Sequence, residues 1–112
     1  MKIYVGADHA GYHLKEHIKQ LLEQKGYTVL DVGSDGTTPH DDYVDYAAMV
    51  AKHVSGTRSK GILVCGTGTG MVIAANKIPG IRAVVAYDQY SAKMSREDND
   101  ANILALRAKK TS

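Results

Sequence analysis

The 112-residue sequence has the length of a single domain, and 44% hydrophobic with 23% charged residues is an ordinary globular balance. A net charge of +2 is too small to make nucleic acid or a membrane surface the expected partner. The chain has one cysteine, which favours a reducing compartment. There is no apolar signal run and no stretch of membrane-spanning length, so we expect a cytoplasmic protein.

The chain begins with a buried strand, Lys2–Gly6, followed by a loop over 7–11 and an amphipathic helix. Apolar residues of this helix share one face at spacings of three and four: Leu14, Ile18, Leu21 and Leu22. Charged residues, Lys15 among them, are assigned to the solvent face. Gly26 is predicted to end the helix, and Tyr27–Asp31 is a second strand.

A turn-rich loop over 33–39 leads to a second helix, capped by Asp41 or Asp42 and closed by Gly56. The continuous apolar run Gly61–Cys65 predicts a third strand. The third helix, starting near Met71, is apolar all round and is therefore expected to be buried. Three further elements are expected: a strand over Ile81–Tyr87, a short helix over Ser91–Arg96 and a strand over Ala101–Leu106.

Strands and helices thus alternate along the whole chain. Such alternation is typical of a parallel sheet with helices on both faces, because parallel strands need crossover connections. We therefore predict one Rossmann-like α/β domain over residues 1–112: a three-layer sandwich with a five-stranded parallel sheet.

A glycine-rich loop after the third strand is the first candidate for chemistry. Gly66, Gly68 and Gly70 allow bare backbone amides to point at an anion at the start of a helix. Cys65 stands at the mouth of this loop. A lone cysteine in an apolar run is more often an inert core residue, but oriented amides at a strand's carboxyl end stabilise a thiolate. Cys65 is therefore a candidate base or nucleophile.

The loop after the first strand is the second candidate. Asp8 and His9 follow that strand, just as the loop from Cys65 to Gly70 comes at the end of the third, so both loops lie at the carboxyl edge of the sheet, where ligands bind. Asp8 as a helix cap and His9 as a plain loop residue are the structural alternatives. Tyr43, near the start of the second helix, either packs in the core or points its hydroxyl into the cleft.

A dinucleotide-binding fold is an alternative explanation of the glycine loop. Asp88 follows the glycines by about 20 residues, where a ribose-binding acid is expected. However, Met71 stands where that fingerprint has its third glycine. No metal site is predicted, because His40, Asp41 and Asp42 fit a solvated turn better than a ligand set.

Several motifs in order resemble the ribose-5-phosphate isomerase B / galactose-6-phosphate isomerase family. They span Met1 to about Leu106, and they are Gly6–Gly11, Asp42–Ala47, Cys65–Met71, Ala74–Lys77, Gly80–Ala83 and Asn99–Asn102. The resemblance implies an aldose–ketose isomerase that needs no metal or cofactor. It also implies a homodimer, or a larger assembly, with sites at the interface.

The resemblance further assigns roles to individual residues. It implies that Cys65 moves the proton between C1 and C2 of the sugar phosphate, while Thr67 and the amides of Gly66, Gly68 and Gly70 stabilise the enediolate. The remaining assignments concern the substrate's hydroxyl and phosphate groups: Asp8 and Asn99 hold hydroxyls, Tyr43 lines the pocket and His9 reaches the phosphate.

Three departures from the family pattern matter. Asp98 occupies the position of the family's ring-opening histidine, and it offers a base without a cationic form. Lys109 replaces a phosphate-binding arginine and loses its two-pronged geometry, unless Arg107 substitutes. The family's C-terminal helix is not found, so apolar surface near the last strand is expected to be exposed or covered by a partner chain.

We therefore expect isomerisation of ribose 5-phosphate to ribulose 5-phosphate. Two alternatives stay open: isomerisation of a six-carbon allose or galactose 6-phosphate, and a non-catalytic relative that binds sugar phosphates. The departures at Asp98 and Lys109 favour the latter, whereas Cys65, Asp8 and the glycine loop favour the enzyme.

Overall fold

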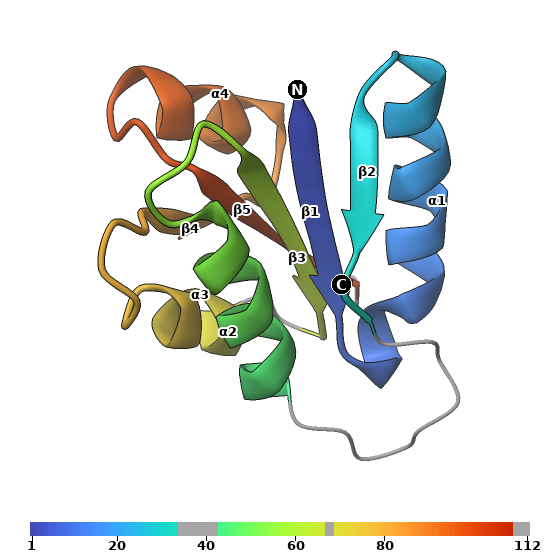
Figure 1. The fold of residues 1–112 in the computed structure, drawn as a ribbon, viewed down its shortest axis with the longest axis horizontal. Coiled ribbons are helices and arrows are strands. Elements are labelled where there is room, and N and C mark those ends of the chain that lie inside the picture. Colours follow the sequence, from blue (N-terminus) through green and yellow to red (C-terminus); the bar gives the residue numbers. More distant parts are fainter. Residues whose placement is uncertain (34–42, 67–68, 109–112) are drawn as a thin grey trace.

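The computed structural model describes residues 1–33, 43–66 and 69–108, and its centre is a parallel sheet with strand order β2-β1-β3-β5-β4 (Figure 1). The strands are β1 (Lys2–Ala7), β2 (Thr28–Asp31), β3 (Lys60–Cys65), β4 (Ala83–Val85) and β5 (Ile103–Arg107). Every pairing between neighbouring strands is parallel. The predicted α/β fold with a five-stranded parallel sheet is therefore confirmed.

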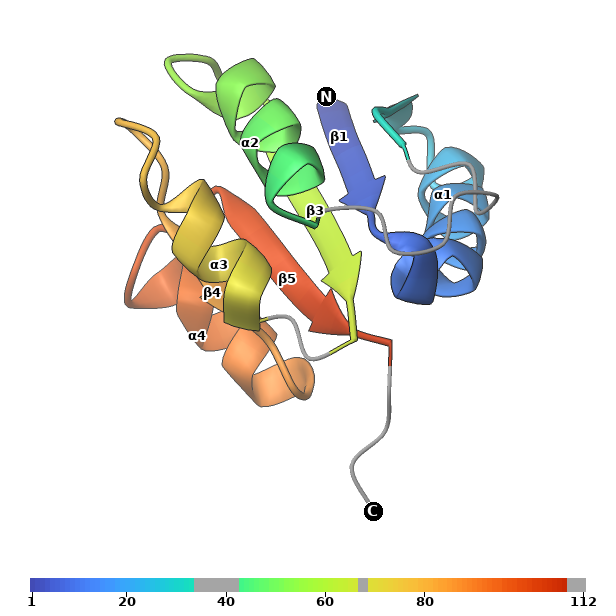
Figure 2. The ribbon, with the colours of Figure 1, turned by 90° about the horizontal axis from the view of Figure 1, so that it is seen from below.

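Helices cover both faces of the sheet, as right-handed crossovers require. They are η1 (His9–Gly11), a short 3₁₀ turn, and α1 (Tyr12–Gln24), α2 (Tyr43–Val54), α3 (Thr69–Ala75) and α4 (Gln89–Glu97). Figure 2 shows α1 on one side of the sheet and α2 and α3 on the other. Helix α4 lies on the α1 side, because its Ala92 and Ser95 share a groove with Ile62 and Leu104.

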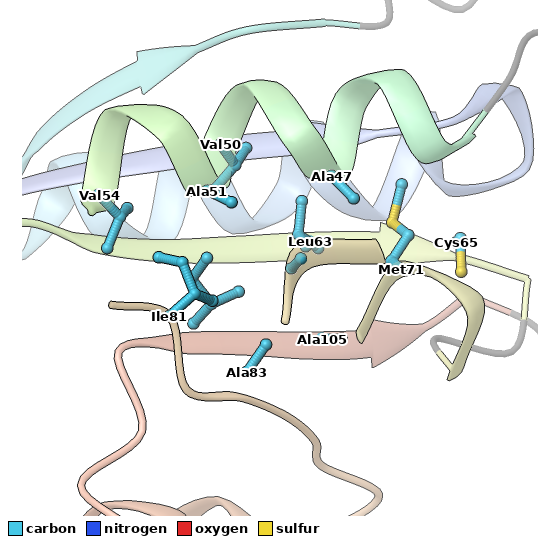
Figure 3. Packing of buried hydrophobic residues seen from close by; sticks show 12 residues of the cluster. Ala47, Val50, Ala51, Val54, Leu63, Cys65, Met71, Ile81, Ala83 and Ala105 are labelled. Atoms are coloured by element: carbon cyan, nitrogen blue, oxygen red, sulfur yellow. The ribbon is translucent and has the colours of Figure 1, made fainter. Parts of the chain in front are cut away.

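The main core lies between the sheet and the pair α2 and α3. Leu63, Val50 and Met71 are fully buried there, together with small residues such as Ala105 (Figure 3). Side chains alternate along each strand, so Leu63 and Cys65 of β3 face α3 whereas Ile62 faces the other side. This packing fixes α3 and the end of β3 relative to each other.

Helix α3 is less buried than its composition predicts. Met71 and Ala75 are buried, but the side chain of Ile73 is 64% exposed. One face of a helix with only two turns contacts the sheet, and Ile73 lies on the opposite face. The helix also begins at Thr69, two residues before the expected start.

The face of α1 that meets the sheet also differs from the prediction. Leu21 is 44% exposed, whereas Lys15, assigned to solvent from its charge, is buried. The row that packs inward follows the spacing of four, three and four residues through Gly11, Lys15, Ile18 and Leu22. The prediction that Lys15 faces solvent is therefore wrong. Its charge is compatible with burial because an acidic residue at the end of β2 forms an ion pair with it.

On the other face, an apolar groove of about 310 Å³ lies between α4 and the strands. Ile3, Ile62 and Leu104 form part of its wall. None of the described helices combines the length and the hydrophobicity that a membrane span requires.

Candidate functional site

Strands β1 and β3 are neighbours, so the loops that follow them meet. Ala7 lies opposite Val64 in the register, which places Asp8 beside Cys65 at the carboxyl edge of the sheet. The backbone N–H of Asp8 donates to the carbonyl of Val64 at 3.3 Å, and this bond joins the two loops directly. The prediction that both loops lie at the same edge of the sheet is confirmed.

A pocket of about 310 Å³ opens at this edge. The residues that line it come from the loop after β1, the start of α2 and the loop and helix after β3: Asp8, Tyr43, Cys65, Gly66, Thr69 and Gly70. Five of these six were predicted as site residues. The structure therefore assembles the catalytic cysteine candidate, a carboxylate and a phenol around one cavity.

Cys65 belongs to the core and to the pocket at once. Its side chain is 5% exposed and lies at the rim of the core cluster, beyond Met71 at the end of β3 (Figure 3). Its carbonyl accepts a hydrogen bond of 2.7 Å from the N–H of Ala108, which ties β3 to the end of β5. Cys65 is thus held in place by core packing, and the same residue forms part of the pocket lining.

Tyr43 closes one wall of the pocket by packing on Gly70. A β-carbon added to Gly70 would lie 2.7 Å from Cε2 of the Tyr43 ring and 2.8 Å from its hydroxyl oxygen. A β-carbon does not approach a non-bonded atom this closely, so the ring can lie there only because residue 70 is glycine. The phenol is 40% exposed, which places it at the mouth of the cavity rather than in the core.

Asp8 also has the structural role that the sequence left open. Its carboxylate accepts a hydrogen bond of 3.0 Å from the N–H of Gly11 and so caps the turn η1. This contact orients the side chain at the rim of the pocket. His9, the next residue, is exposed at the start of η1 and does not line the described cavity.

Asp98 and Asn99 lie at the opposite edge of the sheet. Asp98 is the C-cap of α4, and the carbonyl of Asn99 accepts from the guanidinium of Arg82, just before β4. Strand β5 then runs from Ile103 to Arg107, which is in register with Cys65. Four residues of strand span about 13 Å. Within one chain, these two residues are therefore not brought to Cys65.

Three predicted residues, Thr67, Gly68 and Lys109, lie outside the described part of the chain. Thr69 lines the pocket but was not predicted. Because the helix was expected to start near Met71, Thr69 was not recognised as a residue of the first turn of α3. Arg107 ends β5 beside Cys65 in the register, and its guanidinium lies 4.7 Å from the centre of the Tyr87 ring. The structure thus adds a cation to the same edge.

Asp88, the acid of the dinucleotide alternative, caps a helix instead. Its carboxylate accepts a hydrogen bond of 2.7 Å from the N–H of Ser91, and the Ser91 hydroxyl accepts from the N–H of Asp88. The hydrogen bond from the Ser91 backbone lowers the pKa of Asp88. Within the described ranges, no group of three or more His, Cys, Asp or Glu side chains could hold a metal ion.

Comparisons with known proteins identify this architecture. Residues 3–112 match the family model described as Ribose/Galactose Isomerase. Ribose-5-phosphate isomerase B of Escherichia coli is 48% identical over 106 residues, covering 94% of this chain and 70% of that protein. D-erythrulose-4-phosphate isomerase of Pectobacterium atrosepticum is 44% identical over 110 residues, covering 97% and 72%.

A solved structure gives the same result. Ribose-5-phosphate isomerase B from Mycoplasma genitalium with bound ribulose-5-phosphate superimposes with a TM-score of 0.94 at 35% identity, over 99% of this chain and 74% of that one. The family match covers nearly the whole chain, and the pocket lies where the sheet order and the motifs predict it. The chain therefore belongs to the ribose/galactose isomerase family and is a sugar-phosphate isomerase.

Proposed function

We propose that this protein interconverts ribose 5-phosphate and ribulose 5-phosphate, with Cys65 as the base. The observation that carries the proposal is the pocket at the end of β3, where Cys65, Asp8 and Tyr43 surround one cavity. The substrate is inferred from the relatives, one of which is a ribose-5-phosphate isomerase B with bound ribulose-5-phosphate. The pocket binds the open-chain sugar with C1 and C2 next to the sulfur.

The reaction moves one proton between two carbons. The Cys65 thiolate removes the proton from C2 of the aldose, and the electron pair of that C–H bond forms the C1–C2 double bond of an enediolate. The hydroxyl proton on O2 passes to O1, and the thiol returns its proton to C1. No electron leaves the sugar, so this step requires no redox partner.

The enediolate carries a negative charge that exists only during the reaction. Donors fixed at its position lower the barrier directly, because they need no reorganisation when the charge appears. We assign this role to Thr67 and to the amides of the glycine loop. Asp8 and Asn99 hold the sugar hydroxyls, while His9 and Lys109 bind the phosphate.

We further propose that a second copy of the chain completes the site. A single chain keeps Asp98 and Asn99 at the amino edge of the sheet, far from Cys65. A dimer that brings the amino edge of one subunit to the carboxyl edge of its partner reunites them. This arrangement agrees with the interface sites that the family resemblance implies.

Turnover and proton exchange test the chemistry. Wild type should form ketose from ribose 5-phosphate, and in heavy water the product should carry deuterium at C1. Cys65→Ala should abolish both. Ser95→Ala, the control, changes a buried small polar side chain in α4 and should retain both. Allose 6-phosphate and erythrose 4-phosphate extend the substrate panel. Binding of these sugars without turnover would instead support the non-catalytic alternative, which Asp98 favours.

Alkylation gives an independent test of the same residue. Because Cys65 is the only cysteine, iodoacetamide reports on it alone. Modification should inactivate the protein, and ribulose 5-phosphate should slow the inactivation. Alkylation with full retention of activity would contradict the role of the thiolate.

Subunit complementation tests the shared site. Cys65→Ala and Asn99→Ala should each be inactive, but co-expressed chains form mixed dimers with one intact site. Random pairing makes half of the dimers mixed, so about one quarter of wild-type activity should return. Sites built within one chain would recover none.

A further inference from the structure

The most unusual buried group in the described chain is the side chain of Lys15. It is 1% exposed, and it is the largest of the fully buried side chains. A buried ammonium group is costly unless a carboxylate and hydrogen bonds accompany it. The proposed reaction assigns it no role.

Asp31, at the end of β2, is the acidic partner of Lys15. The ammonium nitrogen lies 2.8 Å from Oδ1 and 2.9 Å from Oδ2 of that carboxylate. It also lies 5.4 Å from the centre of the Tyr12 ring. Lys19 approaches Asp31 from the solvent side at 2.8 Å. The pair therefore fastens the first turn of α1 to the end of β2.

Two consecutive hydrogen bonds connect Asp31 through Gly33 to Ala7, the residue that precedes Asp8. Oδ1 of Asp31 accepts from the N–H of Gly33 at 2.8 Å, and the Gly33 carbonyl accepts from the N–H of Ala7 at 2.8 Å. Gly33 has a φ of +112°, and a β-carbon there would lie 2.9 Å from the Tyr46 ring. Ala7 is the residue before Asp8, so this line of hydrogen bonds fixes the backbone on which Asp8 stands.

A second line reaches the Asp8 side chain through α1. Lys15 holds the start of this helix against β2, and Gly11, the N-cap of α1, donates its N–H to the Asp8 carboxylate. Asp31 thus stands where both lines meet. Asp31 is therefore connected both to the backbone that precedes Asp8 and to the helix whose N-cap donates to the Asp8 carboxylate.

We propose that Lys15 and Asp31 are positioning residues for Asp8, and hence for the hydroxyl-binding side of the pocket. The inference rests on the proposed function, since it takes Asp8 as a substrate ligand. It predicts that the pair acts on substrate binding and turnover separately from its effect on stability.

The test uses variants that remove the ion pair without leaving a buried charge. Breaking one half of a buried pair is strongly destabilising, whereas neutral replacement of both halves is often tolerated. Lys15→Met/Asp31→Asn keeps an acceptor for the Gly33 N–H in the amide oxygen of the new side chain. Lys15→Met/Asp31→Leu removes it. Lys19→Met is the matched control, because it removes a lysine that contacts the same carboxylate at the same distance.

We expect Lys15→Met/Asp31→Leu to lower kcat/KM for ribose 5-phosphate about tenfold, since misplacement by about 1 Å reduces rates by up to about a hundredfold. The asparagine variant should lose less, and Lys19→Met should behave as wild type. Calorimetric affinity for ribulose 5-phosphate should follow the same order. Thermal denaturation confirms that each variant is folded.

A cycle with Asp8→Ala separates positioning from simple support of the fold. If the pair acts through Asp8, the leucine double variant adds no further loss of affinity in the Asp8→Ala background. Additive losses, or unchanged affinity and turnover in the leucine variant, would overturn the inference. Wild type without turnover of any aldose phosphate would refute the proposed reaction instead, and the affinity cycle would still decide the role of Lys15 and Asp31.

Discussion

Gly70→Ala is the substitution that most directly tests the wall of the pocket. The added methyl group would lie 2.7–2.8 Å from three atoms of the Tyr43 side chain. Ordinary contacts between carbon atoms are about 3.5–4.0 Å, so the ring must move by about 1 Å. Tyr43 is partly exposed and can move without opening the core. The clash therefore changes the shape of the site more than it changes the fold.

The substitution should have a small effect on stability and a large effect on activity. Alanine is favoured over glycine by about 1 kcal/mol within a helix, and Gly70 lies in the first turn of α3, so this gain offsets part of the clash. We expect the free energy of unfolding to change by no more than about 1 kcal/mol. By contrast, a wall displaced by about 1 Å should lower kcat/KM by about tenfold or more.

Urea denaturation and initial rates with ribose 5-phosphate measure the two effects. The control is Ile73→Ala, on the exposed side of the same helix, which should alter neither rates nor affinity. Substituting Tyr43→Ala as well as Gly70→Ala removes the clash, so in a Tyr43→Ala background the change at position 70 should cost no activity. Wild-type kcat/KM in Gly70→Ala would refute the assignment of Tyr43 to the substrate-binding wall.

Three further predictions concern the scaffold. Leu63→Ala should lower the free energy of unfolding by about 3 kcal/mol in urea denaturation, because Leu63 is fully buried in the main core. Acid should destabilise the protein through Asp31: burial alone would raise the pKa of this group, but hydrogen bonds from Lys15 and Lys19 outweigh it and the pKa is lowered. The stabilisation is therefore complete above the unfolded pKa of about 3.9 and is lost as the pH falls through the lower native value. Denaturation curves from pH 6 to pH 2 should show this loss in wild type and a smaller one in Lys15→Met/Asp31→Asn, which leaves no buried lysine without its carboxylate. Asp88→Ala should lower the melting temperature by removing the α4 cap, and it should leave the affinity for ribulose 5-phosphate unchanged in calorimetry.

The periodicity of the chain was sufficient to predict the fold, because each strand and helix carries its own local signal. Alternation of strands and helices gave the parallel sheet, and Gly26 and Gly56 mark the ends of α1 and α2 with positive φ angles. Element ends were less accurate. Strand β4 covers only Ala83–Val85 of the expected Ile81–Tyr87, because pairing with β5 is limited to those three positions.

The site was predictable where it depends on strand ends, and not where it depends on tertiary partners. Asp8 follows β1 and Cys65 ends the adjacent strand β3, so the sheet order alone brings them together. Asn99 was grouped with them by resemblance, but the direction of β5 places it at the other edge. Lys15 was misassigned because its burial depends on Asp31, which is 16 residues away and on another element. No local pattern carries that information.

The burial of Cys65 bears on the role of base that we propose for this residue. Cys65 packs in the same cluster as Leu63 and Met71, which are fully buried, and it also lines the pocket. Dense packing on one side limits the rotamers that the side chain can adopt, so its orientation is set before the substrate binds. A base placed on a mobile loop would have to lose this freedom at each turnover. In the proposed mechanism, the packing contacts that stabilise the end of β3 therefore also fix the position of the proton acceptor.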